Sequence, residues 1–370
     1  MAENSKIEWT DATWNPVRGC DPVSPGCANC YAAEVAARFS GLGQPYEGLA
    51  TRHPGQPAKW TGNMRLVPEK LTEPLSWKKP RRVFVNSMSD LFHPAVPFCF
   101  IDQVFAVMAL ARRHTFQILT KRAKRMQRYF EDRSWNDVIV NVVREYDSMP
   151  LLQPAGWLNT FQSLYRITEA ESLAGHEWAC RLPQAWPLPN VWLGVSVENQ
   201  AAADERVPHL LKCPAAVRFL SCEPLLGPVD LLRVDAHGFG GPTGHKVDCI
   251  RKGYWSNGPM GFVNHSDMHD TFGPLHWVIV GGESGPKARP CKLDWIRSIV
   301  EQCQAASVPC FVKQLGSNPL ATASITTPNL SGGDGRNRIE WATKDRKGGD
   351  PAEWPEDLRV RQWPNPEAIA

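Results

Sequence analysis

The sequence has no long hydrophobic run and almost no net charge. Its longest apolar stretch, Val104–Ala111, is far shorter than the ~18 residues that a membrane-spanning helix needs. Lys and Arg exceed Asp and Glu by only three, so any nucleic-acid-binding surface must be local. The first residues lack the apolar segment of a secretion signal. We therefore expect a cytoplasmic protein that does not enter a membrane.

Cysteine, by contrast, is abundant, with eleven residues in 370. In a reducing compartment, clustered cysteines more often bind metals or take part in catalysis than form disulfides. Cys20, Cys27 and Cys30 fall within eleven residues, in a loop bent by two prolines and a glycine. Three thiolates without a local fourth ligand are typical of a [4Fe–4S] cluster with one open iron. The alternatives are zinc completed by a remote ligand, ordinary buried cysteines, or an oxidised pair.

The fold class follows from a repeated pattern of short apolar strands that end in polar residues. Amphipathic segments at 100–113, 201–212 and 293–306 lie between some of these strands and are typical of helices. Strand followed by helix predicts an α/β fold, which we interpret as a partial TIM-type (β/α)6 barrel with its site at the carboxyl ends of the strands. A doubly wound open sheet is the alternative. The six strands are expected at 83–85, 116–119, 191–195, 217–220, 277–280 and 309–312.

Two segments interrupt this pattern, and a tail follows it. We expect the barrel to occupy residues 1–316, with insertions at 131–190 and 235–275. Residues 317–370 mix Gly, Pro, Asn and charged residues, which predicts a largely irregular tail packed on the barrel. The second insertion holds two pairs of potential zinc ligands, although the Gly and Pro residues nearby favour a glycine-rich surface loop with scattered histidines. These residues are His245, Cys249, His265 and His269.

Positive charge gathers in two runs. Arg112–Arg128 contains seven Lys and Arg residues and no acidic residue, and Lys78–Arg82 precedes the strand at 83–85. Nearby aromatic side chains and these cations suit phosphate binding and base stacking. The alternative is a solvated helix face.

Eight short motifs are distributed along the chain: Trp14–Pro16, Gly19–Cys20, Ser24–Ala32, Asn86–Phe92, Leu119–Arg122, Gly194–Asn199, Ser221–Gly227 and Gly281–Pro286. Together they resemble the phage and bacterial three-Cys-motif family. This family is placed near radical S-adenosylmethionine (SAM) enzymes and is distantly similar to spore photoproduct lyase. The cysteine spacing departs from the usual radical SAM motif, because six residues rather than three separate Cys20 and Cys27.

The resemblance implies a partial βα barrel with a SAM-ligated [4Fe–4S] cluster on Cys20, Cys27 and Cys30, and it suggests which strand-end residues would bind SAM. By position, Ser87, Ser89 and Asp90 are assigned to the SAM amine. Either Lys121 or Arg122 is assigned to the SAM carboxylate, and Ser196 and Glu198 to the ribose hydroxyls. Glu223 and Glu283 are expected to face SAM or the substrate. For each Glu, capping of the following helix is the alternative.

These observations predict a radical SAM-type enzyme that generates a 5′-deoxyadenosyl radical. It would need an external electron donor, and a base in DNA or RNA is the substrate that we favour. The alternative is a non-catalytic zinc or iron–sulfur protein that acts as a partner-binding module, since the family that it resembles is associated with a separate partner protein.

Overall fold

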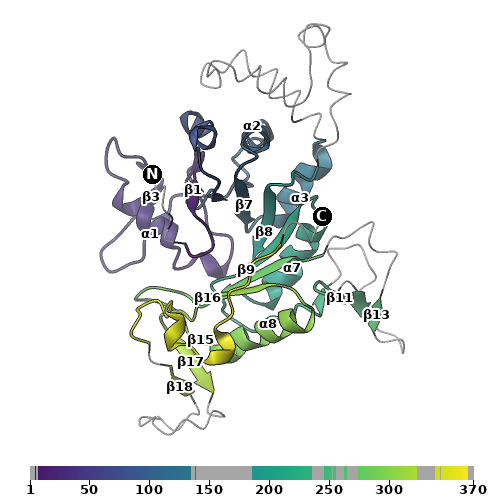
Figure 1. Cartoon of the computed structure of the whole chain (residues 1–370). Helices are drawn as coiled ribbons and strands as arrows, with labels where there is room; N and C mark the ends of the chain where they lie inside the picture. Colours follow the sequence, from purple (N-terminus) through teal and green to yellow (C-terminus); the bar gives the residue numbers. More distant parts are fainter. Residues whose placement is uncertain are drawn as a thin grey trace. The chain divides into compact units, whose positions relative to one another are not determined.

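The computed structural model describes residues 5, 7–134, 138, 186–235, 246–251, 253–255, 262–264, 274–322, 338–341 and 343–365. The chain divides into two compact units, which we describe separately (Figure 1). The first unit contains residues 1–22, 30–193 and 213–216. The second contains residues 23–29, 194–212 and 217–370.

The main sheet has seven strands in the order β1-β6-β7-β8-β9-β14-β16. In the first unit, β6 pairs in parallel with both β1 and β7. In the second, β14 pairs in parallel with β9 and β16. The six strands predicted from the sequence are all present, preceded by β1, which confirms an α/β fold. The bounds are β1 (Ala12–Trp14), β6 (Arg82–Val85), β7 (Thr115–Thr120), β8 (Val191–Ser196), β9 (Val217–Cys222), β14 (Trp277–Gly281) and β16 (Cys310–Gln314).

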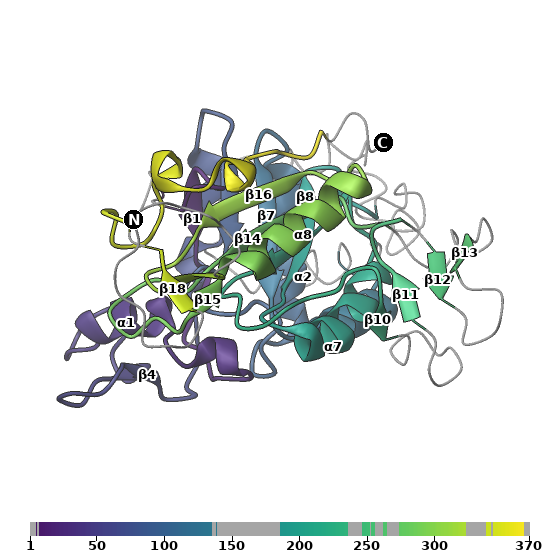
Figure 2. The same ribbon diagram turned by 90° about the horizontal axis from the view of Figure 1, so that it is seen from below.

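The predicted helices are also confirmed, with small shifts at their ends. α7 (Gln200–Leu211) begins after Asn199, whose side chain accepts a hydrogen bond from the Ala202 amide at 3.0 Å and so caps the helix. The sequence predicted a helix as far as Arg113, but α2 ends at Leu110. Arg112 and Arg113 therefore lie in a turn. α8 packs against β14 and β16 (Figure 2). The remaining bounds are α1 (Tyr31–Arg38), α2 (Phe98–Leu110), α3 (Ala123–Asp132) and α8 (Leu293–Ala305).

Short strands and 3-10 turns complete the first unit. β2 (Val17–Arg18) pairs with β5 (Arg65–Leu66), and β3 (Ala50–Thr51) pairs with β4 (Lys59–Trp60). The 3-10 turns η2 (Pro68–Lys70) and η3 (Glu73–Ser76) lead towards β6. Most of the insertion predicted at 131–190 lies outside the described residues.

The second unit contains two further small sheets. Where a second insertion was predicted, antiparallel pairing joins β10 to β11, β11 to β12 and β12 to β13. Of the four potential zinc ligands there, only Cys249 is among the described residues; His245, His265 and His269 lie outside them. The bounds are β10 (Val234–Asp235), β11 (Lys246–Asp248), β12 (Gly253–Trp255), β13 (Phe262–Asn264), β15 (Cys291–Lys292), β17 (Pro319–Thr322) and β18 (Arg338–Glu340).

The described part of the tail belongs to the second unit and packs on its strands β14 and β16. Val312 of β16 donates a backbone hydrogen bond to Val360 at 2.8 Å, and the Trp277 indole donates to the Gln362 carbonyl at 2.9 Å. The Trp277 and Trp363 rings stack with centroids 4.9 Å apart. The described tail includes β17, β18, η8 (Pro351–Glu353) and η9 (Glu356–Leu358), so it is more regular than the sequence suggests. Among the described residues, no helix has the length and apolar character needed to cross a membrane.

Candidate functional site

The first and last cysteines of the loop belong to the first unit and pack on one apolar cluster. The cluster lines α1 and the short strands beside it, and both Cys20 and Cys30 contact it. Cys30 also occupies the N-cap position of α1, beside the partial positive charge of the helix N-terminus. Two thiols ten residues apart are thus brought to the same surface. The buried members of the cluster are Ala32, Ala33, Ala36, Leu49, Ala50, Ala58, Trp60 and Met88.

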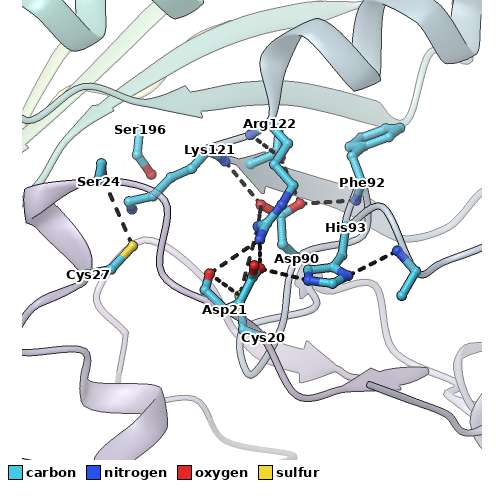
Figure 3. Close-up of polar contacts among 12 residues, drawn as sticks. Cys20, Asp21, Ser24, Cys27, Asp90, Phe92, His93, Lys121, Arg122 and Ser196 are labelled. Atoms are coloured by element: carbon cyan, nitrogen blue, oxygen red, sulfur yellow. Dashed lines mark hydrogen bonds and ion pairs between the residues drawn. The ribbon is translucent and has the colours of Figure 1, made fainter. Parts of the chain in front are cut away.

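Arg122, which follows β7, reaches the first cysteine. Its Nη1 lies 3.9 Å from Cys20 Sγ and 3.0 Å from Asp90 Oδ2 (Figure 3). Its Nη2 contacts the Asp21 carboxylate and lies 3.2 Å from the Asp21 carbonyl oxygen. The Arg122 side chain is only 9% exposed, so its charge acts in a poorly solvated environment.

The buried Asp90 carboxylate organises this arrangement. Besides Arg122, it accepts hydrogen bonds from the Thr120 hydroxyl at 2.7 Å, the Phe92 amide at 3.0 Å and the Lys121 amide at 3.2 Å. Phe92 lies in the turn that follows β6, Thr120 is the last residue of β7, and Lys121 begins the turn that follows β7. Asp90 therefore fixes one turn against the other and orients the guanidinium.

His93 contacts the Asp21 carboxylate, which Arg122 also contacts. Its Nε2 lies 2.7 Å from Asp21 Oδ1, and its Nδ1 accepts a hydrogen bond from the Ala95 amide at 3.1 Å. Because Nδ1 is an acceptor, the proton is on Nε2 and is donated to Asp21. Burial, together with the nearby Arg122 charge, lowers the pKa of His93, which favours this neutral form.

The thiol of Cys20 is held in its protonated form by this environment. Burial raises its pKa to about 12, and the Asp90 carboxylate adds to the effect while Arg122 opposes it. A thiophilic metal binds the thiolate and displaces such a proton. Arg122 is the only one of these three influences that favours the thiolate.

Cys27 lies in the segment 23–29, which belongs to the second unit. Its sulfur is 3.9 Å from the Ser24 hydroxyl, and that hydroxyl donates a short hydrogen bond to Glu198 Oε1. Glu198 Oε2 accepts from Arg206 at 2.8 Å, with side chains only 1% and 3% exposed. The buried ion pair thus provides a fixed acceptor for the cysteine loop.

The loop is packed tightly on Glu198. A Cβ on Gly26 would lie 2.5 Å from Glu198 Cγ, which is closer than real carbon atoms approach. Only glycine fits at this position, because any side chain would displace either the loop or the carboxylate.

A second buried carboxylate holds the other side of the segment. Glu283 Oε2 accepts from Asn29 Nδ2 at 3.0 Å, and Arg289 Nε donates to the same oxygen at 2.9 Å. Arg289 Nη1 also donates to the Pro25 carbonyl at 2.8 Å. Burial alone would raise the pKa of Glu283, but its hydrogen bonds to Arg289 and Asn29 hold the pKa below the ordinary glutamate value.

The other residues that the sequence predicted for the site lie at strand ends, and each forms a hydrogen bond with another residue of the chain. Ser87 and Ser89 donate to Asn15 Oδ1 at 3.2 Å and to the Val17 carbonyl at 2.9 Å. The Ser196 carbonyl accepts from Arg206 at 2.9 Å. Glu223 accepts from Lys313 Nζ at 2.6 Å and from Gln314 Nε2 at 3.2 Å.

The comparison with known proteins gives a family without a described activity. Residues 4–342 match the family described as "Protein of unknown function (DUF5131)". The chain belongs to this family. No curated protein and no solved structure matches it. The DUF5131 match includes the three cysteines and all the carboxylates, arginines and serines described above.

Within the DUF5131 region, several residues of the network were not predicted from the sequence. Asp21 and Asn29 adjoin the cysteines, and that position was the signal available for them. His93 and Arg289 carry no such signal, because they reach Asp21 and the Pro25 carbonyl from distant parts of the sequence. Arg206 is eight residues from Glu198, and the sequence does not show that the two side chains meet. In the part of the chain that the structure describes, no group of three or more His, Cys, Asp or Glu side chains is arranged to hold a metal ion.

Proposed function

We propose that this chain is a radical SAM-type enzyme in which Cys20, Cys27 and Cys30 hold a [4Fe–4S] cluster. The observation that carries the proposal is the shared surroundings of Cys20 and Cys30, which pack on one apolar cluster with the Arg122 guanidinium against Cys20. The fixed segment around Cys27 supports it further. Isolated structural cysteines would need no such support.

The donor set fits an iron–sulfur cluster chemically. Three thiolates add three negative charges, which cannot be buried without compensation. Arg122 supplies a poorly solvated positive charge beside Cys20, and the N-terminus of α1 supplies a partial positive charge at Cys30. When bound, a three-cysteine [4Fe–4S] cluster with SAM and one electron from an external donor supplies cleavage of SAM to methionine and a 5′-deoxyadenosyl radical.

The chain's own residues divide into two roles. Asp90 binds Arg122, which contacts Cys20, while Glu198 and Glu283 accept hydrogen bonds from Ser24 and Asn29 of the cysteine loop. We therefore assign these three carboxylates to holding the cysteines and their loop. Arg122 compensates the charge at Cys20. The proposed contacts to SAM or substrate are then Ser87, Ser89, Lys121, Ser196 and Glu223, which follow or end strands.

The fold supports this assignment. Parallel strands followed by helices present their carboxyl ends as a common edge, which is where α/β enzymes place cofactors and substrates. The polar residues described above follow β6, β7, β8, β9 and β14 at those ends. We propose that the sheet is a partial barrel of the radical SAM kind.

Anaerobic reconstitution tests the proposal. The purified full chain should bind about four irons and four sulfides, absorb visible light as iron–sulfur proteins do, and form 5′-deoxyadenosine from SAM when reduced. Cys20→Ala, Cys27→Ala and Cys30→Ala should each lower the iron content. Cys99→Ala is the matched control, since Cys99 is also half-buried but lies in α2.

The outcomes separate the enzyme from its alternative. Zinc in place of iron, or iron without SAM cleavage, would favour the non-catalytic partner-binding module. Equal iron loss in Cys27→Ala and Cys99→Ala would rule out the proposed ligand set. The substrate that we propose is a base in a nucleic acid.

A further inference from the structure

The basic run at residues 112–128 is split by the fold. β7 separates Arg112 and Arg113, which precede it, from the cations that follow it. The three arginines that follow β7 are engaged: Arg122 in the Cys20 network, Arg125 with the Val96 carbonyl at 2.6 Å, and Arg128 with Asp132 at 3.1 Å. The charge that precedes β7 is therefore a separate feature of the first unit.

Arg112 and Arg113 lie beside the second basic run, at residues 78–82. Arg82 at the start of β6 is paired with Thr115 at the start of β7, and the Thr115 amide donates to the Arg81 carbonyl at 2.9 Å. Arg113 Nη1 lies 3.4 Å from the Trp77 carbonyl oxygen. Two runs more than thirty residues apart in sequence thus meet at the amino end of two adjacent strands.

An aromatic frame fixes this junction. The Trp77 and His114 rings meet edge to face with centroids 5.7 Å apart, and the Arg81 guanidinium lies 5.2 Å from the Trp77 ring centroid. His114 Nε2 is also 3.1 Å from the Pro74 carbonyl oxygen. The turns that carry the cations are therefore fixed, so little backbone conformational entropy is lost when the cations bind a ligand.

The surface has positive charge with little acidic compensation. Lys78, Lys79, Arg112 and Arg113 are exposed, and Arg81 is half-buried. No acidic residue occurs between Glu73 and Asp90 or between Asp102 and Glu131 in the sequence. Asp11, at the border, is paired with Arg82 at 2.9 Å. In a chain with a net charge of only +3, this is a marked local excess.

We propose that these five residues form a binding surface for the phosphate backbone of a nucleic acid. Several cations on adjacent turns suit a ligand with regularly repeated negative charges, and arginine binds phosphate with two parallel hydrogen bonds. An anionic membrane is disfavoured, because among the described residues the exposed large hydrophobic side chains, which membrane insertion requires, lie in other segments. Those side chains are Val23, Tyr31, Phe39 and Leu42. The five residues of the basic surface are Lys78, Lys79, Arg81, Arg112 and Arg113.

The basic surface is distinct from the cysteine site in the same unit. It precedes β6 and β7, whereas Asp90 and Arg122 follow them. Backbone contacts of this kind position a nucleic acid without reading its sequence. The basic surface rests on the proposed function in one respect, since it would dock the nucleic acid that we propose as substrate. Its own basis is charge and geometry, and it does not require an iron–sulfur cluster.

Salt-dependent binding tests the inference. The probes are a fluorescent 20-base-pair DNA duplex and a 20-nucleotide RNA of unrelated sequence, titrated with the full chain between 50 and 200 mM NaCl. Five phosphate contacts predict a slope of log K against log salt of about −4.5 for the duplex, equivalent to a loss of affinity of about 10²–10³-fold over this range. Lys78→Ala/Lys79→Ala should reduce the magnitude of the slope by about two, because two contacts are lost.

A matched control removes two positive charges from a different surface of the chain. Lys344→Ala/Lys347→Ala changes two exposed lysines of the second unit and should leave the slope unaltered. Arg112→Ala/Arg113→Ala should weaken binding like the first pair. Since Arg113 also contacts Trp77, the lysine pair keeps the test valid if the arginine pair lowers stability.

Failure of this inference is distinguishable from failure of the proposed enzyme. Cys27→Ala should bind the duplex as the unchanged chain does, and Lys78→Ala/Lys79→Ala should retain its iron. An unchanged slope in the lysine pair, or equal effects in the control pair, would overturn the inference. Binding to phosphatidylserine vesicles without binding to either nucleic acid would overturn it as well.

Discussion

Arg122 and Cys20, which are 102 positions apart in sequence, lie side by side with Nη1 3.9 Å from Sγ. The same nitrogen is 3.0 Å from Asp90 Oδ2, so one guanidinium connects a thiol to a buried carboxylate. The resemblance noted from the sequence suggests that either Lys121 or Arg122 contacts the carboxylate of SAM. The geometry favours a different role, in which Arg122 compensates negative charge at the first cysteine.

The first prediction concerns the stability of the chain without metal. Arg122→Gln leaves Asp90, 7% exposed, as a buried charge without its cation, and we expect the free energy of unfolding to fall by about 3–5 kcal/mol. Urea denaturation measures this change. Arg128→Gln is the control: Arg128 also pairs with an aspartate, but its side chain is 72% exposed, so its loss should cost at most about 0.5 kcal/mol.

A double variant separates the ion pair from other effects of Arg122. Adding Asp90→Asn removes the unpaired charge, so Arg122→Gln/Asp90→Asn should recover part of the lost stability. A double variant less stable than the sum of the two single changes would contradict this account.

The second prediction concerns the electronic effect of Arg122 on a bound cluster. A positive charge beside a thiolate stabilises the reduced, more negative state, so Arg122→Gln should make the reduction potential more negative. Arg122→Lys keeps the charge but loses the planar fork, and we expect a smaller shift. A redox titration followed by electron paramagnetic resonance measures both. Unchanged potentials with normal iron content would show that Arg122 is only structural.

The fold was largely predictable because its signal is local. Buried parallel strands are largely apolar, and segments such as 191–195 and 277–280 have this composition. The α/β class followed from the alternation of such strands with amphipathic helices. The turn that places Arg112 outside α2 was less predictable, because element ends depend on backbone contacts such as that of Ala111 with Val107.

The site was only partly predictable, because charge pairing depends on contacts between distant segments. The strand-end positions of Asp90, Glu198 and Glu283 were evident from the sequence, but their partners were not. Asp90, for example, pairs with Arg122, which lies 32 positions later in the sequence. The basic run at 112–128 shows the same limit, since neighbours in sequence lie at opposite ends of β7.

The glycine of the cysteine loop gives a third prediction. Gly26→Ala would place a Cβ 2.5 Å from Glu198 Cγ, so the segment 23–29 must shift and the Ser24 hydrogen bond weakens. We expect a loss of about 1–3 kcal/mol of stability and faster reaction of Cys27 with a thiol reagent. Iron content should also fall.

Gly41→Ala provides the matched control for Gly26→Ala. The nearest atom to a Cβ at Gly41 is 3.6 Å away, which is an ordinary contact, so thiol reactivity and iron content should not change. Identical behaviour of the two variants would mean that the packing on Glu198 does not hold the loop.

The last prediction uses the acid sensitivity of Glu283. Its pKa is lowered in the folded chain, because the hydrogen bonds from Arg289 and Asn29 outweigh the opposing effect of burial. The folded state therefore binds this proton less readily than the unfolded state, whose glutamate pKa is about 4.3. Stabilisation by the charged group is complete above that pH and is lost as the pH falls below it towards the folded pKa. We expect Glu283→Gln to be less stable than the unchanged chain by about 1–3 kcal/mol at pH 7, with the difference shrinking below about pH 4.3. Urea denaturation at a series of pH values measures the difference, with Glu356→Gln as an exposed control in the same unit. A difference that stays constant down to pH 3 would refute the assigned role of the Glu283 charge in holding Arg289 and, through it, the cysteine loop.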